Sequence, residues 1–196
     1  MSGTIFTCAV VAKRESLMNN DIKSVLYSEK QLDQAEDKLA AKLTKDYDGR
    51  QPVIVSVLTG AVFFTTDMMK KLDFKATLDF IDVSSYDGTE SSGQVKLEHD
   101  LKHSVKGKDV LVMEDIIDTG RTLQYLLEFL RGRGAKSVKV CAMLDKPAGR
   151  KVDVAADYAG LNVPNEFLVG YGLDYNGLYR NLPYIGILKP SVYANN

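Results

Sequence analysis

The sequence has no tryptophan and only two cysteines and two histidines in 196 residues. Cys8 and Cys141 lie too far apart to form a metal-binding or redox motif, and no Asn-x-Ser/Thr acceptor occurs. The longest apolar stretches, such as residues 110–113, are much shorter than the roughly 20 residues that a membrane-spanning helix needs. The apolar run at 8–12 precedes a basic pair instead of following one, so we expect no signal peptide. These absences predict a protein of a reducing compartment, the cytoplasm, with no membrane partner.

An excess of charge of either sign is also absent. The chain carries 25 Lys and Arg residues against 26 Asp and Glu residues, which gives a net charge of −1. Domains that bind nucleic acid through its phosphates are usually strongly basic, so we expect no nucleic-acid partner. With 45% hydrophobic and 26% charged residues, the composition is that of a globular protein, and the length fits one domain.

Strand-like and helix-like segments alternate along most of the chain. Short apolar runs that contain β-branched residues predict strands, and apolar residues at helical spacing predict helices. The expected strands are 53–58, 77–83, 109–114 and 137–144, and the expected helices are 28–47, 61–72 and one that ends near 132. This alternation predicts an α/β fold with a mostly parallel sheet flanked by helices, and with ligands bound beyond the carboxyl ends of the strands.

Two regions break this alternation. Residues 86–100 are polar, rich in Gly and Ser and longer than an ordinary connection, as is typical of a functional lid or a disordered loop. Strand-like pieces at 167–171 and 184–189 follow the main pattern. Together with residues 1–27, these pieces suggest a sheet edge or a small appended subdomain.

The most informative segment, residues 110–122, reads Val-Leu-Val-Met-Glu-Asp-Ile-Ile-Asp-Thr-Gly-Arg-Thr. An apolar strand leads into Glu114 and Asp115, and Asp118 then begins a hydroxyl-rich turn that opens a helix. Such a turn directs backbone N–H groups and the positive end of the helix dipole at a phosphate. Carboxylates at a strand end can accept hydrogen bonds from a sugar diol or hold a hydrated Mg²⁺. A helix cap accounts for one acidic residue but not for three, so the segment predicts a site for a phosphorylated sugar.

This segment resembles the phosphoribosyl pyrophosphate (PRPP) signature of type I phosphoribosyltransferases. Four further motifs extend the resemblance over most of residues 25–189 to the hypoxanthine-guanine branch of the family: Leu58-Thr59-Gly60, Ser85-Tyr86, Lys146-Pro147, and residues 167–175 with Arg180 beyond. The resemblance implies a type I phosphoribosyltransferase fold in a single domain, 1–196. A small hood is expected from about 1–27 and 165–196, and a mobile lid, with Ser85 and Tyr86, at about 85–100.

The resemblance also implies an activity and a set of roles. The expected enzyme belongs to purine salvage and forms IMP or GMP and pyrophosphate from PRPP and hypoxanthine or guanine, with Mg²⁺ as cofactor. Glu114 and Asp115 would hold the ribose hydroxyls and a metal, Asp174 would bind a second Mg²⁺, and Asp118 would be the acid/base group near purine N7. The 5′-phosphate would be cradled by Asp118, Thr119, Gly120, Arg121 and Thr122.

Pyrophosphate is assigned by the same resemblance to Leu58, Thr59, Gly60 and Arg180. In this family the loop often contains a cis peptide bond that does not involve proline. Its middle residue is often Lys in relatives but is Thr59 here. Since backbone amides can do most of the binding, we expect activity to survive. Any contribution of the missing lysine to pyrophosphate affinity or to communication between subunits is open.

The base site can be argued from chemistry as well. Lys146 carries donors only, so it suits the O6 acceptor of hypoxanthine and guanine, whereas the amino group of adenine would leave those donors unpaired. By resemblance, Phe167 would stack on the purine, and backbone carbonyls near Leu168 and Asp174 would accept its N–H groups.

Two alternatives to this interpretation stay open. A related enzyme can prefer xanthine or another base, and the PRPP signature also occurs in regulators that sense PRPP or nucleotides without catalysis. Lys146, Asp174 and Arg180 favour an enzyme, because a sensor needs no groups that stabilise departing pyrophosphate. Relatives usually form dimers or tetramers, so we expect a homodimer or homotetramer.

Overall fold

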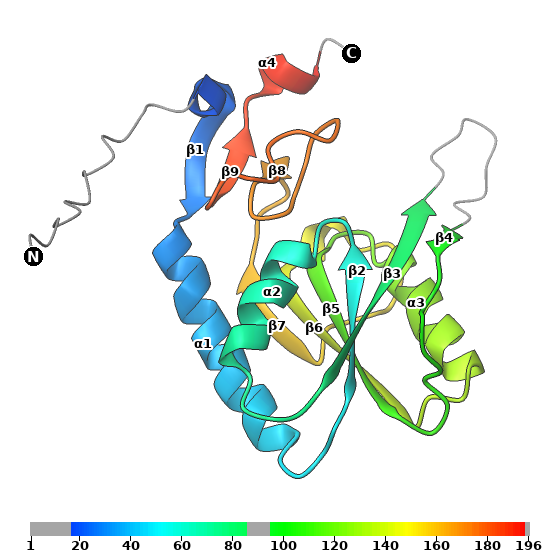
Figure 1. Ribbon diagram of the computed structural model, residues 1–196. Helices are drawn as coiled ribbons and strands as arrows, with labels where there is room; N and C mark the ends of the chain where they lie inside the picture. The colour runs from blue at the N-terminus through cyan, green and yellow to red at the C-terminus, as the bar shows by residue number, and fades with distance from the viewer. Residues whose placement is uncertain (1–16, 86–94, 195–196) are drawn as a thin grey trace, which may run out of the picture.

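The computed structural model describes residues 17–85 and 95–194, and its larger part is a six-stranded sheet with strand order β4-β3-β2-β5-β6-β7 (Figure 1). Neighbouring strands are parallel throughout, except that β4 at one edge runs antiparallel to β3. The strands are β2 (Val53–Leu58), β3 (Thr77–Ser85), β4 (Val95–His99), β5 (Asp109–Ile117), β6 (Ser137–Asp145) and β7 (Tyr158–Asn162). The expected mostly parallel sheet of an α/β fold is therefore confirmed.

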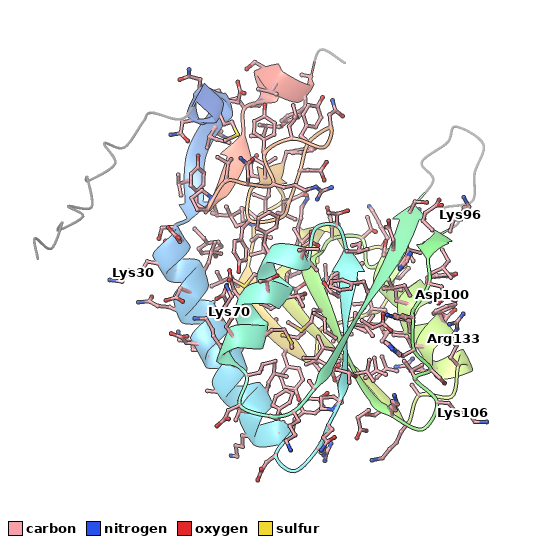
Figure 2. All side chains as sticks on the ribbon, viewed as in Figure 1. Lys30, Lys70, Lys96, Asp100, Lys106 and Arg133 are labelled. Carbon is pink, nitrogen blue, oxygen red and sulfur yellow. The ribbon has the colours of Figure 1, made fainter. Side chains whose placement is uncertain are left out.

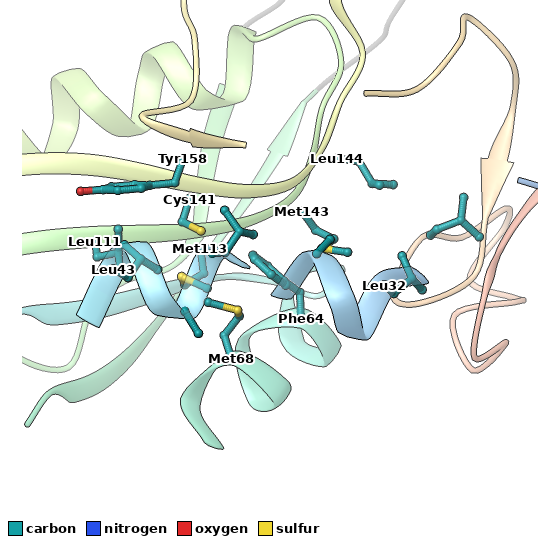
Figure 3. Packing of buried hydrophobic residues seen from close by; sticks show 14 of the residues in the cluster. Leu32, Leu43, Phe64, Met68, Leu111, Met113, Cys141, Met143, Leu144 and Tyr158 are labelled. Atoms are coloured by element: carbon teal, nitrogen blue, oxygen red, sulfur yellow. The ribbon is translucent and has the colours of Figure 1, made fainter. Parts of the chain in front are cut away.

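Helices cover both faces of this sheet because the side chains of each strand alternate between two apolar clusters. One cluster joins alternate strand residues such as Ile54, Leu111 and Met143 to helices α1 (Glu29–Asp46) and α2 (Val62–Lys71), as Figure 3 shows for part of it. The other joins Val55, Val112 and their neighbours to α3 (Arg121–Gly132). The three predicted helices are present. A capping box opens α1, with the Ser28 N–H donating to Gln31 Oε1 at 3.0 Å.

A second, three-stranded antiparallel sheet has the order β1-β9-β8. It consists of β1 (Ile22–Tyr27), β8 (Leu168–Val169) and β9 (Ile185–Leu188), with the short helices η1 (Leu17–Asp21) and α4 (Pro190–Tyr193) beside it. Figure 1 shows this smaller sheet above the ends of β2 and β7, toward which those strands point. The two ends of the described chain thus meet over the carboxyl edge of the large sheet.

Three sequence expectations need correction. Residues 95–99 are not part of a loop but form β4, and the alternation of apolar and polar residues from Val95 to Glu98 was a usable strand signal. Strand β7 was missed because Gly160 interrupts it. A Cβ there would lie 2.6 Å from the Met143 carbonyl oxygen, so close strand packing explains the glycine. Strand β5 extends through Ile117, so the acidic pair lies within the strand and not after it.

An ion pair joins the edge of the large sheet to α3. The side chain of Asp100, just after β4, accepts two hydrogen bonds from Arg133, at the end of α3, at 2.6 and 2.8 Å (Figure 2).

Among residues 17–85 and 95–194, no helix is long and apolar enough to cross a bilayer. Cys8, Tyr86 and residues 86–94 of the expected lid lie outside the described residues.

Candidate active site

Glu114 and Asp115 place two carboxylates near the end of the central strand β5. Glu114 is buried, and its Oε2 has no hydrogen-bond partner among the described residues. Asp115 Oδ1 accepts the Ile116 N–H at 2.7 Å. Burial raises the pKa of both groups above the ordinary carboxyl value, and the proximity of each charge to the other adds to the rise for Glu114, while Arg180 opposes it for Asp115. The pair is therefore a strong attractor for a cation or for hydroxyl donors.

The turn that follows β5 joins these carboxylates to α3. Gly120, with φ +83°, is the residue before the helix, and Arg121 and Thr122 lie in its first turn. The N–H of Lys151 donates to the Thr119 carbonyl at 2.9 Å. The first turn of a helix offers N–H groups that have no partner within the helix, which suits an anion. The structure thus places the five predicted phosphate-binding residues at one helix N-terminus.

Arg150 stabilises this turn through hydrogen bonds to its backbone, and the sequence analysis did not identify this residue. Its guanidinium donates to the carbonyl oxygens of Asp118 at 3.1 Å and Ile117 at 3.3 Å, and it also contacts the Val154 carbonyl and the Asp145 carboxylate. A planar guanidinium can donate in several directions at once, so Arg150 fixes the backbone from which Asp118 projects. Nothing in its local sequence marks Arg150, because its acceptors come from three other segments.

Asp118 and Lys146 form an ion pair, although separate roles were predicted for them. Lys146 Nζ lies 3.0 Å from Asp118 Oδ2, and the Lys146 side chain is only 12% exposed. The Lys146 backbone N–H also donates to the Ile117 carbonyl at 3.0 Å, which brings the end of β6 beside the end of β5. A proton acceptor and a cationic donor therefore lie side by side in the lining of one pocket.

A cavity of about 280 Å³ is lined by all of the predicted base-binding and catalytic residues. Its lining residues are Asp115, Ile116, Asp118, Lys146, Glu166, Phe167, Leu168, Leu173 and Asp174. The Phe167 ring stacks on Tyr193 of α4, with centroids 5.0 Å apart, and meets the edge of Tyr175 at 5.4 Å. The cavity has a carboxylate side, a lysine and an aromatic wall, which is the mixed lining expected for a small planar polar ligand. Glu166 belongs to it and was not predicted.

Two of the residues predicted to bind pyrophosphate, Gly60 and Arg180, lie against Asp115 and Asp174, which line this cavity. The peptide bond between Leu58 and Thr59 is cis, as the resemblance implied. A Cβ at Gly60 would lie 1.7 Å from Asp115 Oδ2, so the loop backbone rests directly on that carboxylate. Arg180 donates to the Gly172 carbonyl at 2.5 Å and pairs with Asp174 Oδ1 at 2.7 Å. Ser85 is the last residue of β3.

The carboxylates fit Mg²⁺ in their chemistry, with most of the coordination left to a substrate. In the part of the chain that the structure describes, no three His, Cys, Asp or Glu side chains converge as a ready metal site. Mg²⁺ prefers oxygen ligands and is often bound by one or two carboxylates together with phosphate oxygens and water. The unpartnered Glu114 Oε2 and the adjacent Asp115 meet that requirement. Asp174 is already engaged by Arg180 and by the Gly177 N–H at 2.7 Å.

Comparisons with known proteins agree with this geometry. The family model for the phosphoribosyl transferase domain matches residues 23–176, so the chain belongs to the phosphoribosyltransferase family and has its type I fold. It is 52% identical over 180 residues to the hypoxanthine-guanine phosphoribosyltransferase of Bacillus subtilis, which covers 91% of this chain and all of that protein. A crystal structure of a hypoxanthine phosphoribosyltransferase from Staphylococcus aureus superposes with a TM-score of 0.88 at 49% identity, over 92% of this chain and 99% of that one.

A further relative is longer. The bifunctional protein TilS/HprT of Listeria monocytogenes serotype 4b is 58% identical over 178 residues, or 90% of this chain. The chain spans 28% of the length of that relative.

Proposed function

We propose that the protein transfers the 5-phosphoribosyl group of PRPP to N9 of hypoxanthine or guanine, giving IMP or GMP and pyrophosphate in purine salvage. The observation that carries the proposal is the single cavity that joins the Asp118–Lys146 pair to Asp115 and Asp174. The names of the Bacillus subtilis and Staphylococcus aureus relatives support the same activity.

The residues that line the cavity would bind the purine base. Lys146 donates to the O6 acceptor of the purine, and its near-complete burial makes an unpaired donor costly, which selects against adenine. Phe167, backed by Tyr193, offers a rigid face for stacking. Backbone carbonyls near Leu168 and Asp174 accept the N–H groups of the base.

Asp118 is proposed as the group that takes the N7 proton while N9 attacks ribose C1. Its carboxylate borders the cavity, and Arg150 fixes the backbone on either side of it. When the base enters, Lys146 shares its donors between O6 and Asp118, so the two groups act on O6 and N7, which lie on the same edge of the purine. A positioned acid/base group of this kind typically contributes about 10²–10⁴-fold.

The ribose and phosphates occupy the other side. Glu114 and Asp115 accept hydrogen bonds from the ribose hydroxyls, and residues 118–122 hold the 5′-phosphate at the start of α3. Leu58, Thr59, Gly60 and Arg180 hold the pyrophosphate. Bound Mg²⁺, carried by Glu114, Asp115 and Asp174 with the substrate oxygens, would neutralise charge on the departing pyrophosphate.

The terminal regions and the segment after β3 would complete the proposed site. Residues of about 1–27 and 165–196 would form the hood over the site, and Ser85 and Tyr86 would lie on a lid at about 85–100 that closes to exclude water. We also propose a homodimer or homotetramer, a cytoplasmic location, and no nucleic-acid or membrane partner.

The test is product formation from PRPP with hypoxanthine, guanine, xanthine and adenine, each with Mg²⁺ and with a chelator in its place. Metal-dependent IMP and GMP without AMP is the expected result. Turnover of adenine would contradict the role of Lys146, and xanthine as the preferred base would move the protein to a related specificity. Tight PRPP binding without turnover of any base would instead identify a sensor of PRPP.

A further inference from the structure

A polar cluster lies outside the proposed active site, between α1 and α2. The Tyr171 hydroxyl contacts Oε1 of Glu36, a buried residue of α1, and lies 3.0 Å from Oδ2 of Asp67 on α2. The other oxygen of each carboxylate faces a lysine, with Lys70 at 2.8 Å from Asp67 Oδ1 and Lys71 at 3.6 Å from Glu36 Oε2. The cluster forms part of the wall of a cavity of about 720 Å³, beside which Figure 2 labels Lys30 on α1 and Lys70 on α2.

Tyr171 comes from a turn in which three successive residues have positive φ. Gly170 has φ +98°, Tyr171 +47° and Gly172 +100°. A Cβ at Gly170 would lie 2.1 Å from the Tyr184 carbonyl oxygen, and one at Gly172 would lie 2.0 Å from the Gly60 carbonyl oxygen. Glycine on both sides leaves the backbone free to adopt many conformations, and a non-glycine residue at positive φ is disfavoured. The Tyr171 side chain is the one side chain of this turn that can anchor it to the helices.

The same turn carries the groups assigned to pyrophosphate. The Gly172 N–H donates to the Arg180 carbonyl at 3.0 Å, and the Arg180 guanidinium donates back to the Gly172 carbonyl at 2.5 Å. That guanidinium also pairs with Asp174 Oδ1. Because the Gly172 backbone rests on Gly60, a shift of the turn moves both Arg180 and the loop at 58–60.

We propose that Tyr171 is a positioning residue for the pyrophosphate half of the site, acting through its hydrogen bond to Glu36. The inference deepens the proposed function and rests on it. Tyr171 has one hydroxyl proton and two carboxylate neighbours, and we assign Glu36 as the main acceptor because it is buried, whereas the Asp67 side chain is 38% exposed and pairs with Lys70. Asp67 adds a second tie, since α2 begins just after Gly60 and Ala61. Tyr171 touches no substrate; it fixes the turn that orients Arg180.

The first test compares Tyr171→Phe with Tyr158→Phe. Both changes remove a tyrosine hydroxyl that donates to a carboxylate, but Tyr158 bonds to Asp46 at 3.0 Å, at the far end of α1 from this turn. In the full chain, Tyr171→Phe is expected to raise KM for PRPP, and for pyrophosphate in the reverse reaction, by about five- to tenfold. KM for hypoxanthine is expected to stay within about twofold, and Tyr158→Phe to leave every KM unchanged within that range.

A double-mutant cycle tests the route through Glu36. Glu36→Gln keeps an acceptor for the hydroxyl and is expected to retain the wild-type KM for PRPP. Glu36→Leu removes the main acceptor and is expected to raise that KM by less than Tyr171→Phe does, because Asp67 remains within reach of the hydroxyl. Because Tyr171→Phe already breaks the bond to Glu36, the double variant Tyr171→Phe/Glu36→Leu is expected to be no worse than Tyr171→Phe alone. Circular dichroism at a temperature well below each unfolding midpoint establishes that the variants are folded.

The outcomes separate this inference from the proposed function. A wild-type protein that forms no IMP or GMP overturns the proposed function and the inference with it. If the wild-type enzyme is active, three results would overturn the inference alone. Tyr171→Phe could raise KM for PRPP and for hypoxanthine equally, it could raise neither, or the effects in the double-mutant cycle could be additive.

Discussion

The proposed purine half of the site (Asp118, Lys146, Phe167) and the proposed pyrophosphate half (Gly60, Gly172, Arg180) are built by different means. In the purine half, side chains form the surface, and an ion pair of 3.0 Å and an aromatic ring line the cavity. In the pyrophosphate half, backbones approach so closely that a Cβ at either glycine would lie within 2.0 Å of a neighbouring oxygen atom. Chemistry in the first half therefore depends on functional groups, and in the second on the position of the main chain.

The comparison predicts that the largest effect comes from a change of functional group in the purine half. Asp118→Asn keeps the shape of the side chain but removes its basicity, so turnover is expected to fall by about 10²–10⁴-fold. The dissociation constant for PRPP, measured by calorimetry, is expected to change by less than about threefold. Asp157→Asn is the matched control, because Asp157 also pairs with a lysine, Lys139 at 2.6 Å, away from the cavity. Unchanged turnover in Asp118→Asn would remove this residue from the mechanism.

In the pyrophosphate half, the smallest possible side chain is expected to be nearly as damaging. Gly60→Ala would place a methyl group 1.7 Å from Asp115 Oδ2, so the loop must move, and kcat/KM for PRPP is expected to fall by about 10²-fold. Gly132→Ala is the control, since a Cβ there meets no atom within 4 Å. Steady-state kinetics with PRPP as the varied substrate checks the difference. Equal kinetics for the two alanine variants would contradict the assignment of this half to the backbone.

A third change separates recognition of the base from binding of PRPP. Lys146→Met removes the donors to O6, and KM for hypoxanthine is expected to rise by about 10–100-fold while KM for PRPP changes little. Lys139→Met makes the same substitution at the control ion pair and is expected to leave both constants unchanged. If Lys146→Met raised KM for PRPP as much as KM for hypoxanthine, the assignment of Lys146 to recognition of the base would be wrong.

The smallest effect concerns the pH dependence of stability at the anchor of the pyrophosphate half. Burial raises the pKa of Glu36, with Asp67 nearby adding to it, although the hydrogen bond from Tyr171 opposes the rise. The folded protein therefore binds this proton more tightly than the unfolded chain, and stability from this group is lost as pH rises through the raised pKa. We expect urea unfolding to show that Glu36→Gln gains stability relative to the wild type between pH 5 and pH 8.

Exposed Glu98 provides the contrast for that measurement. Hydrogen bonds from Lys96 and Ser84 lower the pKa of Glu98, so its contribution is present above the ordinary carboxyl pKa and lost as pH falls. Glu98→Gln is expected to give a smaller difference of the opposite sign, since this group is exposed to solvent. Parallel behaviour of the two variants would contradict the assigned cause.

Features that depend on the local sequence could be predicted, whereas contacts between distant residues could not. The helix at 29–46, the parallel strands and the acidic segment at 110–122 were readable because periodicity and side-chain type carry that information. The pairing of Lys146 with Asp118, the bracing by Arg150 and the anchoring of Tyr171 between Glu36 and Asp67 were not. Each joins residues that are far apart in the chain, and only the packing of the elements determines that they meet.

Edge strands were the other limit. Gly160 within β7 reads as a break until its closeness to the Met143 carbonyl is known. Strand β4 follows a polar, Gly- and Ser-rich stretch, and its residues were predicted to be part of the same loop. Both strands have a neighbour on one side only, so few apolar residues mark them.

A competition assay tests whether Lys146 selects the base. PRPP and Mg²⁺ are mixed with equal amounts of hypoxanthine, guanine and adenine in one reaction, with wild-type protein and Lys146→Met measured side by side. The wild type is expected to form IMP and GMP but no AMP, and the variant to form a much smaller excess of IMP over AMP. AMP formed by the wild type at a rate similar to that of IMP, or the same product ratio from both proteins, would contradict selection of the base by Lys146.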